Sequence, residues 1–316
     1  MAHDDDIRVL HLVTAREIFF EQQIEILEKK GIDCTVCVVP GSEQIDGNMG
    51  SRRGIREYLQ YLPQVRRELR RGEYDLIHSN YGLTLPYAAT QFQLPVVLTL
   101  WGSDVIGVDG VVTKAFAWRA DAVTVRSTEM RELIGRHDAH IVPSGVDIER
   151  FRPIDRSEAR TRVGWDMGDR HVLFPYSPEY ERKNFPLAKQ VVDQVGKKLG
   201  MDITLQTISG VDHEQMPYYM NAADCVLLTS EHEGSPNTVK EAMACNVPVV
   251  STDVGDVQER LDGVSPGGVG SSETELIQLV CEVLKSHGRS DGRKAVMEVS
   301  WDRIGDKILD IYHSVL

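Results

Sequence analysis

The chain has 316 residues, of which 41% are hydrophobic, and this length suits two α/β domains of ordinary size. Its formal net charge is −13, from 35 basic and 48 acidic residues, which argues against general binding to nucleic acid. No apolar run approaches the roughly 20 residues that span a bilayer, and the N-terminus lacks the features of a signal peptide, so we expect a cytoplasmic protein. The five cysteines are scattered, so we expect no disulfide framework.

Strand and helix patterns alternate along the first half of the chain, as they do in parallel α/β sheets. The expected strands cover 7–13, 34–39, 76–78, 96–100 and 122–125, and the expected helices cover 17–30, 52–71 and 86–92. Pro63 predicts a break in the second helix, because proline lacks the N–H group that would bond four residues back. Cys34 and Cys37 lie three residues apart in a strand and point to opposite faces, which favours core packing over redox or metal chemistry.

The segment 143–153 holds two prolines and a glycine without a clear period, so it predicts a linker. The alternation then restarts, with expected strands at 172–174, 203–207, 226–228 and 247–251, and helices at 186–199, 272–285 and 301–316. We therefore expect two Rossmann-like domains whose parallel sheets face each other across a cleft, the first over 1–146 and the second over 147–300. No Gly-x-Gly-x-x-Gly follows the first strand of either half, which argues against a dehydrogenase.

Two glutamates, Glu233 and Glu241, are separated by seven residues across the junction between an expected strand and the helix that follows it. Ser235 is the predicted N-cap of that helix, and Pro236 suits its first position. The free N–H groups of the first turn and the positive end of the helix dipole favour a bound phosphate. Two carboxylates on either side of a phosphate site suit a nucleotide sugar, which carries hydroxyl groups at both ends of a diphosphate.

Several motifs together resemble the large family of retaining glycosyltransferases with the two-Rossmann GT-B architecture, which includes sucrose and mannosyl transferases. Glu233–Glu241, followed by Ala-Met-Ala, resembles the donor-binding signature of that family. Four further segments resemble other elements of the family: its His-Gly-x-Asp element at Trp101–Asp104, its interdomain segment at 141–153, its basic phosphate-binding turn at Arg182–Asn184, and the approach to its motif strand at Met220–Asp224.

The resemblance implies that Glu233 holds hydroxyl groups of the donor sugar and that Glu241 holds those of the ribose. Lys183 would neutralise the phosphates, and Arg16, in the segment that replaces the family's glycine-rich first loop, would also serve the diphosphate. With these cations and a helix terminus, no metal is required. The implied catalytic residues are Glu233, Lys183, Arg182 and Asp104, and the implied donor-binding residues are Glu241, Gly234, Ser235, Asn237, Thr238, Trp101, Gly102 and Arg16.

The chain departs from the family pattern at two positions. Ser177 stands where the family has an arginine ahead of the lysine, and Arg182 is expected to take over its role. Trp101 stands where the family has a histidine; its ring can pack on a sugar face, but it cannot exchange protons. Asp104 and His78 therefore remain as polar candidates at neighbouring strand ends. An Asp-x-Asp sequence at 4–6 is not expected to bind a metal, because it lies at the chain terminus.

The segment 52–71 concentrates positive charge in an acidic protein. Its arginines are Arg52, Arg53, Arg56, Arg66, Arg67, Arg70 and Arg71, and its expected apolar side is formed by Ile55, Leu59, Leu62, Val65 and Leu69. Two interpretations stay open. The segment contacts an anionic acceptor or an anionic membrane, such as one that holds a lipid-linked phosphate sugar, or it is a solvated helix paired with Glu57 and Glu68.

The resemblance therefore predicts a metal-independent glycosyltransferase of the hexosyl type that retains the anomeric configuration. It would move a sugar from a nucleoside diphosphate to a saccharide or lipid-linked acceptor, in the cytoplasm or at the inner membrane face. The donor would lie against the C-terminal domain and the acceptor against the N-terminal one, to which helix 301–316 would return. A sugar-nucleotide epimerase of the same architecture and a non-catalytic glycosyltransferase-like subunit are the alternatives.

Overall fold

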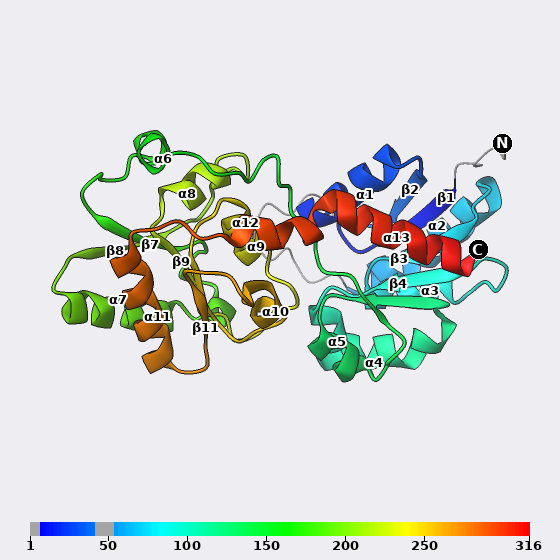
Figure 1. Ribbon diagram of the computed structural model, residues 1–316. Coiled ribbons are helices and arrows are strands. Elements are labelled where there is room, and N and C mark those ends of the chain that lie inside the picture. Colours follow the sequence, from blue (N-terminus) through cyan, green and yellow to red (C-terminus); the bar gives the residue numbers. More distant parts are fainter. Residues whose placement is uncertain (1–6, 42–53) are drawn as a thin grey trace. The chain divides into compact units, whose positions relative to one another are not determined.

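The computed structural model describes residues 7–41 and 54–316, so Arg52, Arg53 and the Asp-x-Asp at 4–6 lie outside the described residues. The chain divides into two compact units, Met1–Gly145 with Trp301–Leu316, and Val146–Ser300. Each unit holds one parallel sheet with helices around it (Figure 1). The predicted fold class of two α/β domains with parallel sheets is confirmed.

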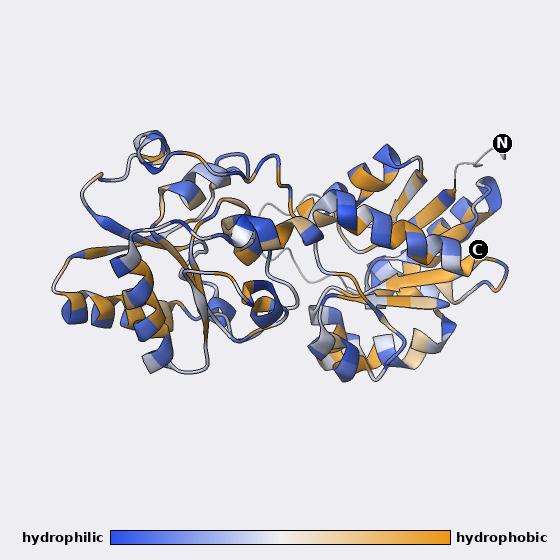
Figure 2. Ribbon diagram, viewed as in Figure 1, coloured by the Kyte–Doolittle hydropathy of each residue, from blue (hydrophilic) through white to orange (hydrophobic). Residues whose placement is uncertain are grey.

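The first unit contains, over its described residues, a six-stranded parallel sheet in the order β2-β1-β3-β4-β5-β6. Its strands are β1 Arg8–Val13, β2 Asp33–Val38, β3 Leu76–Ser79, β4 Val96–Thr99, β5 Ala122–Val125 and β6 His140–Ile141. Its helices are α1 Ile18–Lys29, α2 Ile55–Arg71, α3 Leu85–Ala88, α4 Gly107–Phe116, α5 Thr128–Ile134 and α13 Trp301–Val315. The inner strands β1, β3, β4 and β5 are mostly apolar and buried, because helices cover both faces of the sheet, whereas the edge strands β2 and β6 are only partly buried (Figure 2).

Helix α13 packs beside α1 in the first unit (Figure 1). The Lys30 ammonium lies 2.8 Å from Asp302 and 2.6 Å from Asp306. A Cβ at Gly305 would lie 2.6 Å from the Lys30 side chain and 3.1 Å from that of Ile26, so the glycine lets the lysine lie directly against α13. The far end of the chain is thereby tied to the first helix.

Helix α2 continues through Pro63, so the predicted break is wrong. Pro63 lies on the exposed side, where water can bond the carbonyl group that the proline leaves without a partner, while Tyr61 and Val65 are fully buried on the opposite side and hold both turns against the core. The predicted apolar side is also wrong at Leu59, which is 70% exposed. The tyrosines at 58 and 61 take its place at the core.

The predicted helix 86–92 is wrong beyond Ala88, because the Gln91 side chain accepts hydrogen bonds from the N–H groups of Gln93 and Leu94 and closes a turn instead. Helix α4 was not predicted, since it contains two glycines. One of them, Gly110, is required by packing: a Cβ at this position would lie 2.5 Å from the carbonyl oxygen of Val105.

A buried polar network lies where α13 meets the sheet of the first unit. The two ring nitrogens of His78 lie 2.6 Å from the Tyr312 hydroxyl and 2.7 Å from the Thr99 hydroxyl. The His11 ring lies 5.2 Å from the His78 ring, and Asn80 bonds both histidines. Burial lowers the pKa of His11 to about 3, and burial together with the positive charge of its neighbours lowers the pKa of His78 well below its usual value.

We predict that this pair makes the chain sensitive to mild acid. Both histidines are neutral when folded but titrate near 6.5 when unfolded, so below that pH the unfolded state binds more protons and stability falls as pH falls. The free energy of unfolding, measured in urea, should drop by roughly 3–4 kcal/mol between pH 7 and pH 5. His11→Asn should reduce this dependence, whereas the exposed His140→Asn should not. Equal stability at the two pH values would contradict the prediction.

The second unit contains a five-stranded parallel sheet in the order β11-β10-β9-β7-β8. Its strands are β7 Arg170–Phe174, β8 Ile203–Thr207, β9 Cys225–Leu228, β10 Val249–Thr252 and β11 Gly268–Gly270. Its helices are α6 Arg156–Val163, α7 Phe185–Leu199, α8 Met216–Ala222, α9 Asn237–Ala244, α10 Val257–Leu261, α11 Glu273–Ser286 and α12 Gly292–Val296. Because β7, β9 and β10 are neighbours and parallel, the loops that follow them meet at one edge of the sheet, where ligands of such sheets bind.

Candidate functional site

Glu233 and Lys183 form an ion pair at the carboxyl edge of the second sheet. The Lys183 ammonium lies 2.5 Å from a Glu233 carboxylate oxygen, and the two side chains are 23% and 15% exposed. Lys183 ends a short 3-10 turn after β7, and Glu233 lies in the loop between β9 and α9. The fold thus brings together two residues that are 50 positions apart, while leaving both accessible to a ligand.

Tyr176 holds this lysine from its other side. The Lys183 ammonium lies 3.9 Å from the centre of the Tyr176 ring, and the Tyr176 hydroxyl donates a 2.8 Å hydrogen bond to Thr238. Burial opposes the charge of Lys183, but Tyr176 and Glu233 outweigh it and raise the lysine pKa, so the side chain stays a cation. The loop after β7 is thereby tied to the first turn of α9. Motif matching did not single out Tyr176.

Helix α9 begins at Asn237, with Pro236 as its N-cap and no side-chain cap. The prediction that Ser235 caps the helix is wrong, because its hydroxyl is bonded to Asp256 and Lys240 instead. Within the described ranges the first-turn N–H groups therefore have no side-chain acceptor, and the positive end of the helix dipole is left for an anion. Asn237 adds a carboxamide oxygen that is buried and lacks a hydrogen-bond partner among the described residues.

Glu241 lies in the second turn of α9 and is 9% exposed. One of its carboxylate oxygens lies 3.4 Å from His213 Nε2, and Arg150 donates to the other ring nitrogen of His213 over 2.9 Å. With Nδ1 as the acceptor, Nε2 carries the proton and points it toward Glu241. The Phe151 ring contacts His213 edge-on. Arg150 and Phe151 come from the predicted linker, so a linker segment contributes to the surroundings of the second glutamate.

Two further predicted residues, Arg182 and Gly234, make their described contacts through backbone carbonyl groups. The Arg182 side chain is exposed, and its backbone carbonyl accepts a bond from the N–H of Glu231. Gly234 packs its carbonyl against Gly255, where an added Cβ would lie 2.5 Å away. Gly255 has a φ of +59°, so glycine is needed there both for its conformation and for space.

In the first unit, Asp104 is fully buried and bonded to backbone. One carboxylate oxygen accepts from the N–H groups of Trp101 and Gly102, each over 2.9 Å, and the other accepts from Gly82 over 3.3 Å. These bonds favour the ionised form, but burial outweighs them and raises the pKa of Asp104. The carboxylate therefore shapes the turn after β4, with Gly102 at a φ of +134°. Its catalytic role stays a prediction.

Trp101 is half-buried and packed on several sides. Its ring lies 4.4 Å from the Phe19 ring and 3.5 Å from the Arg126 guanidinium, and its N–H donates to the carbonyl of Asn80. Arg16 is exposed, with its guanidinium 3.4 Å from Glu21. Its place at a diphosphate also stays a prediction. His78 is not available to a ligand, because it lies in the buried network described above.

The described part of the chain holds no group of three metal-ligating side chains. Within 7–41 and 54–316, no helix has the length and hydrophobicity to cross a membrane. Cys34 and Cys37 are free thiols, and burial raises their pKa values to about 12 and about 11.

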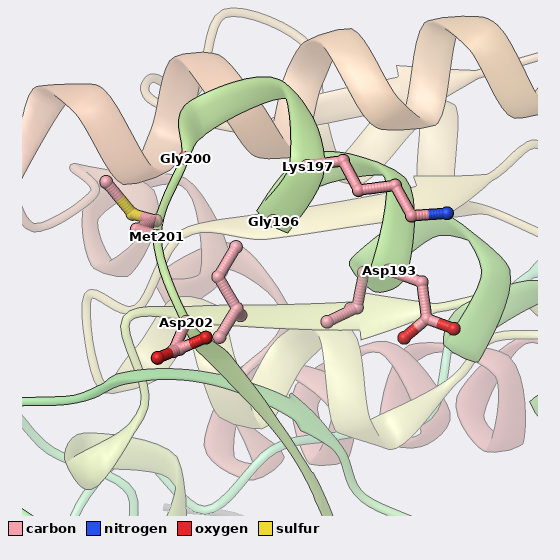
Figure 3. A pocket seen from close by; sticks show the side chains of 8 residues that line it. Asp193, Gly196, Lys197, Gly200, Met201 and Asp202 are labelled. Carbon is pink, nitrogen blue, oxygen red and sulfur yellow. The ribbon is translucent and has the colours of Figure 1, made fainter.

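Two surface pockets are lined by other residues. One is formed by α7 and the turn into β8, where Asp193, Lys197 and Asp202 line it (Figure 3). Because it lies at the amino end of β8, it is at the opposite edge of the sheet from Glu233. The other lies along α2 and is lined by Leu62, Pro63, Arg66, Arg67, Arg70 and Arg71.

Comparison with known families gives two matches along the chain. Residues 17–150 match the model described as Glycosyltransferase Family 4, and residues 187–286 match that of Glycosyl transferases group 1. The TuaC protein of Bacillus subtilis, named provisionally as a teichuronic acid biosynthesis glycosyltransferase, is 27% identical over 76% of this chain and 77% of its own. A D-inositol 3-phosphate glycosyltransferase of Saccharomonospora viridis is also 27% identical, over 78% of this chain and 71% of its own.

Solved structures agree in fold at lower identity. A sucrose-phosphate synthase from Thermosynechococcus elongatus superposes with a TM-score of 0.76 at 17% identity, covering 98% of each chain. Anabaena HepE in complex with UDP-glucose superposes with a TM-score of 0.74 at 17% identity, covering 98% of this chain and all of its own.

Proposed function

This chain is a glycosyltransferase of the GT-B type, and we propose that it moves a hexose from a nucleoside diphosphate donor to a saccharide or lipid-linked acceptor with retention. The observation that carries the proposal is the Lys183–Glu233 pair beside the uncapped start of α9. A structural neighbour that binds UDP-glucose supports a uridine nucleotide as the first donor to test.

The donor's diphosphate would lie at the first turn of α9. Backbone N–H groups and the helix dipole stabilise an anion there, and Lys183 adds a full positive charge. Glu233 would accept hydrogen bonds from hydroxyl groups of the sugar, and Glu241 from those of the ribose, with the proton on His213 Nε2 beside it. Charge develops on the diphosphate as the glycosidic bond breaks, so the same cation and N–H groups stabilise the transition state.

The acceptor would be held by the first unit, at the ends of its strands. Trp101 cannot exchange a proton, and the Asp104 oxygens are engaged by backbone N–H groups. We therefore propose that the leaving phosphate itself accepts the proton of the acceptor hydroxyl on the face where the donor departs. This geometry retains the anomeric configuration. No metal is needed in this scheme, because Lys183 and α9 supply the positive charge.

The test is product analysis with UDP-glucose labelled in its sugar, with and without a mixture of saccharide and lipid-linked acceptors. The proposal predicts label in the acceptor, joined with the anomeric configuration of the donor when examined by NMR. Release or isomerisation of the sugar without any acceptor would favour the epimerase alternative. Failure of the chain to bind any nucleoside diphosphate would favour a non-catalytic subunit.

We propose in addition that α2 contacts an anionic membrane. Among the described residues, no carboxylate forms an ion pair with the arginines at 56, 66, 67, 70 or 71, so the predicted pairing with Glu57 and Glu68 is not observed. Leu59 is exposed between these arginines and can enter the headgroup region. In a chain of net charge −13, such a face is complementary to an anionic surface.

Changing Arg66, Arg67 and Arg70 together to serine should weaken co-sedimentation with phosphatidylglycerol vesicles by at least about tenfold, since each basic residue near such a surface contributes roughly 1 kcal/mol. The matched control changes three exposed lysines of α7, at 189, 197 and 198, to serine and removes the same charge from the other unit. Equal loss in the two variants, or no loss in either, would contradict the membrane contact.

A further inference from the structure

Lys240 is a charged residue that the fold buries completely, within the donor loop's own helix. Its ammonium donates a 2.8 Å hydrogen bond to the Ser235 hydroxyl and a 3.2 Å bond to the Ser235 carbonyl. The Ser235 hydroxyl donates in turn to Asp256 over 2.8 Å, and Asp256 is 1% exposed. A continuous chain of bonds therefore links α9, the loop 233–236 and the turn that precedes α10.

The direction of these bonds is fixed by chemistry. A hydroxyl has one proton, so Ser235 accepts from the ammonium and gives its proton to the carboxylate. Asp256 has a second cation beside it, since Arg260 lies 3.5 Å away. Its other carboxylate oxygen is buried without a hydrogen-bond partner among the described residues. Asp256 is thus held to the loop through the single oxygen that bonds Ser235.

The backbone holds the same loop from the same turn. A Cβ on Gly255 would lie 2.5 Å from the Gly234 carbonyl and 2.9 Å from the Glu233 carbonyl, so the two backbones are in direct contact. A single residue separates Ser235 from Glu233, and a single residue separates it from Asn237, where α9 starts. Fixing Ser235 therefore fixes both the glutamate and the first-turn N–H groups.

Packing alone does not account for these charges. Burying an ammonium and a carboxylate costs several kcal/mol of desolvation for each, and apolar residues of similar size are often equally stable or more so. Both charges contact the same residue, Ser235, through its hydroxyl. A hydrogen-bonded link of this kind restricts orientation in a way that apolar packing does not.

We propose that Lys240, Ser235 and Asp256 form a positioning relay that sets the geometry of the donor loop. Lys240 and Asp256 touch neither the sugar nor the diphosphate; they act through Ser235 on Glu233 and on the N–H groups of α9. The inference rests on the proposed function, and it assigns a role to two residues outside the implied donor set. The diphosphate and the sugar depend on this geometry, whereas the nucleoside beside Glu241 does not.

The test is the double variant Lys240→Met with Asp256→Asn, which removes both charges together and leaves neither one unpaired. We expect it to fold and to lose about a hundredfold in turnover, the size of effect that a small displacement of reacting groups produces. Calorimetry should show affinity for UDP falling by about tenfold while affinity for UMP, which lacks the second phosphate, stays within about twofold. Lys285→Met, an exposed lysine of α11, is the control and should change none of these values.

A double variant that folds and keeps the turnover and the UDP-to-UMP ratio of the unmodified chain would overturn the relay. Equal loss of UDP and UMP affinity would also overturn it, because that indicates general damage. If the double variant does not fold, Ser235→Ala, which keeps both charges and the bond from Lys240 to the carbonyl of residue 235 but removes the shared hydroxyl, must show the same selective loss. Failure of the unmodified chain to bind UDP or any other nucleoside diphosphate is a distinct result, which overturns the proposed function itself.

Discussion

Replacing Glu233 with alanine will lower turnover by about a hundredfold or more, the loss seen when a preorganised transition-state contact is removed. The carboxylate is placed to accept hydroxyl groups of the sugar, and it also fixes the Lys183 ammonium, so alanine removes one contact and loosens another. The residue lies in a loop and is partly exposed, so the fold should survive. Initial rates at saturating donor, with the thermal midpoint measured alongside, check both statements.

Glu231→Ala is the matched control, because Glu231 is an exposed glutamate in the same loop with no ion pair among the described residues. It should leave turnover within about twofold, as expected of a surface substitution away from the site. Turnover of Glu233→Ala equal to that of the unmodified chain would remove Glu233 from the site.

Replacing Lys183 with methionine should lower turnover by about a hundredfold to a thousandfold, because the ammonium would stabilise the charge that develops on the leaving diphosphate. Methionine keeps most of the packing against Tyr176 but leaves the Glu233 carboxylate without its cation. The negative charge of that carboxylate would then repel the phosphates of the donor. Both kcat and kcat/KM should fall, since the interaction strengthens in the transition state.

The neighbouring arginine provides the comparison. Arg182 is exposed and one residue away, so Arg182→Met should cost no more than about tenfold, in line with a screened surface charge. Lys189→Met, on the exposed side of α7, should have no effect. If Arg182→Met proves more damaging than Lys183→Met, the exposed guanidinium rather than the ammonium serves the phosphates.

Local patterns in the sequence predict most of the fold. The strands at 203–207 and 122–125 have the bounds that hydrophobic runs and their flanking turns indicate, and α13 follows its apolar period. The Ser235-Pro236 pair predicts the start of α9 to within a residue, although the cap is Pro236 and not Ser235. These features are encoded within a few neighbouring positions, so a single sequence is enough to find them.

The errors have long-range causes. Serine is a preferred residue type at N-caps, but the Ser235 hydroxyl donates its hydrogen bond to Asp256, 21 positions away. Pro63 has the chemistry of a helix breaker, but burial of Tyr61 and Val65 on the other side keeps the helix intact. Contacts of this kind depend on which segments the fold brings together, and no local pattern contains them.

The same limit applies to the site. Resemblance to a family indicates Glu233 and Lys183 separately. Only the structure shows that they form an ion pair beside Tyr176, with the ammonium 2.5 Å from a carboxylate oxygen. It also shows that Asp104 is occupied by backbone N–H groups and that Lys240 is buried against Ser235. Residues that hold other residues in place carry little signal in sequence, because their role lies in a partner far along the chain.

The central claim is that the edge of the second sheet around α9 binds a nucleoside diphosphate sugar, and thermal-shift titration with a panel of such sugars tests it most directly. A ligand that binds only the folded state raises its stability by RT ln(1 + [L]/Kd), so the melting temperature should climb with the concentration of at least one donor, UDP-glucose being the first choice. The climb should be much smaller in Lys183→Met. A flat response to every nucleotide sugar, or an equal response in Lys183→Met, would contradict the account.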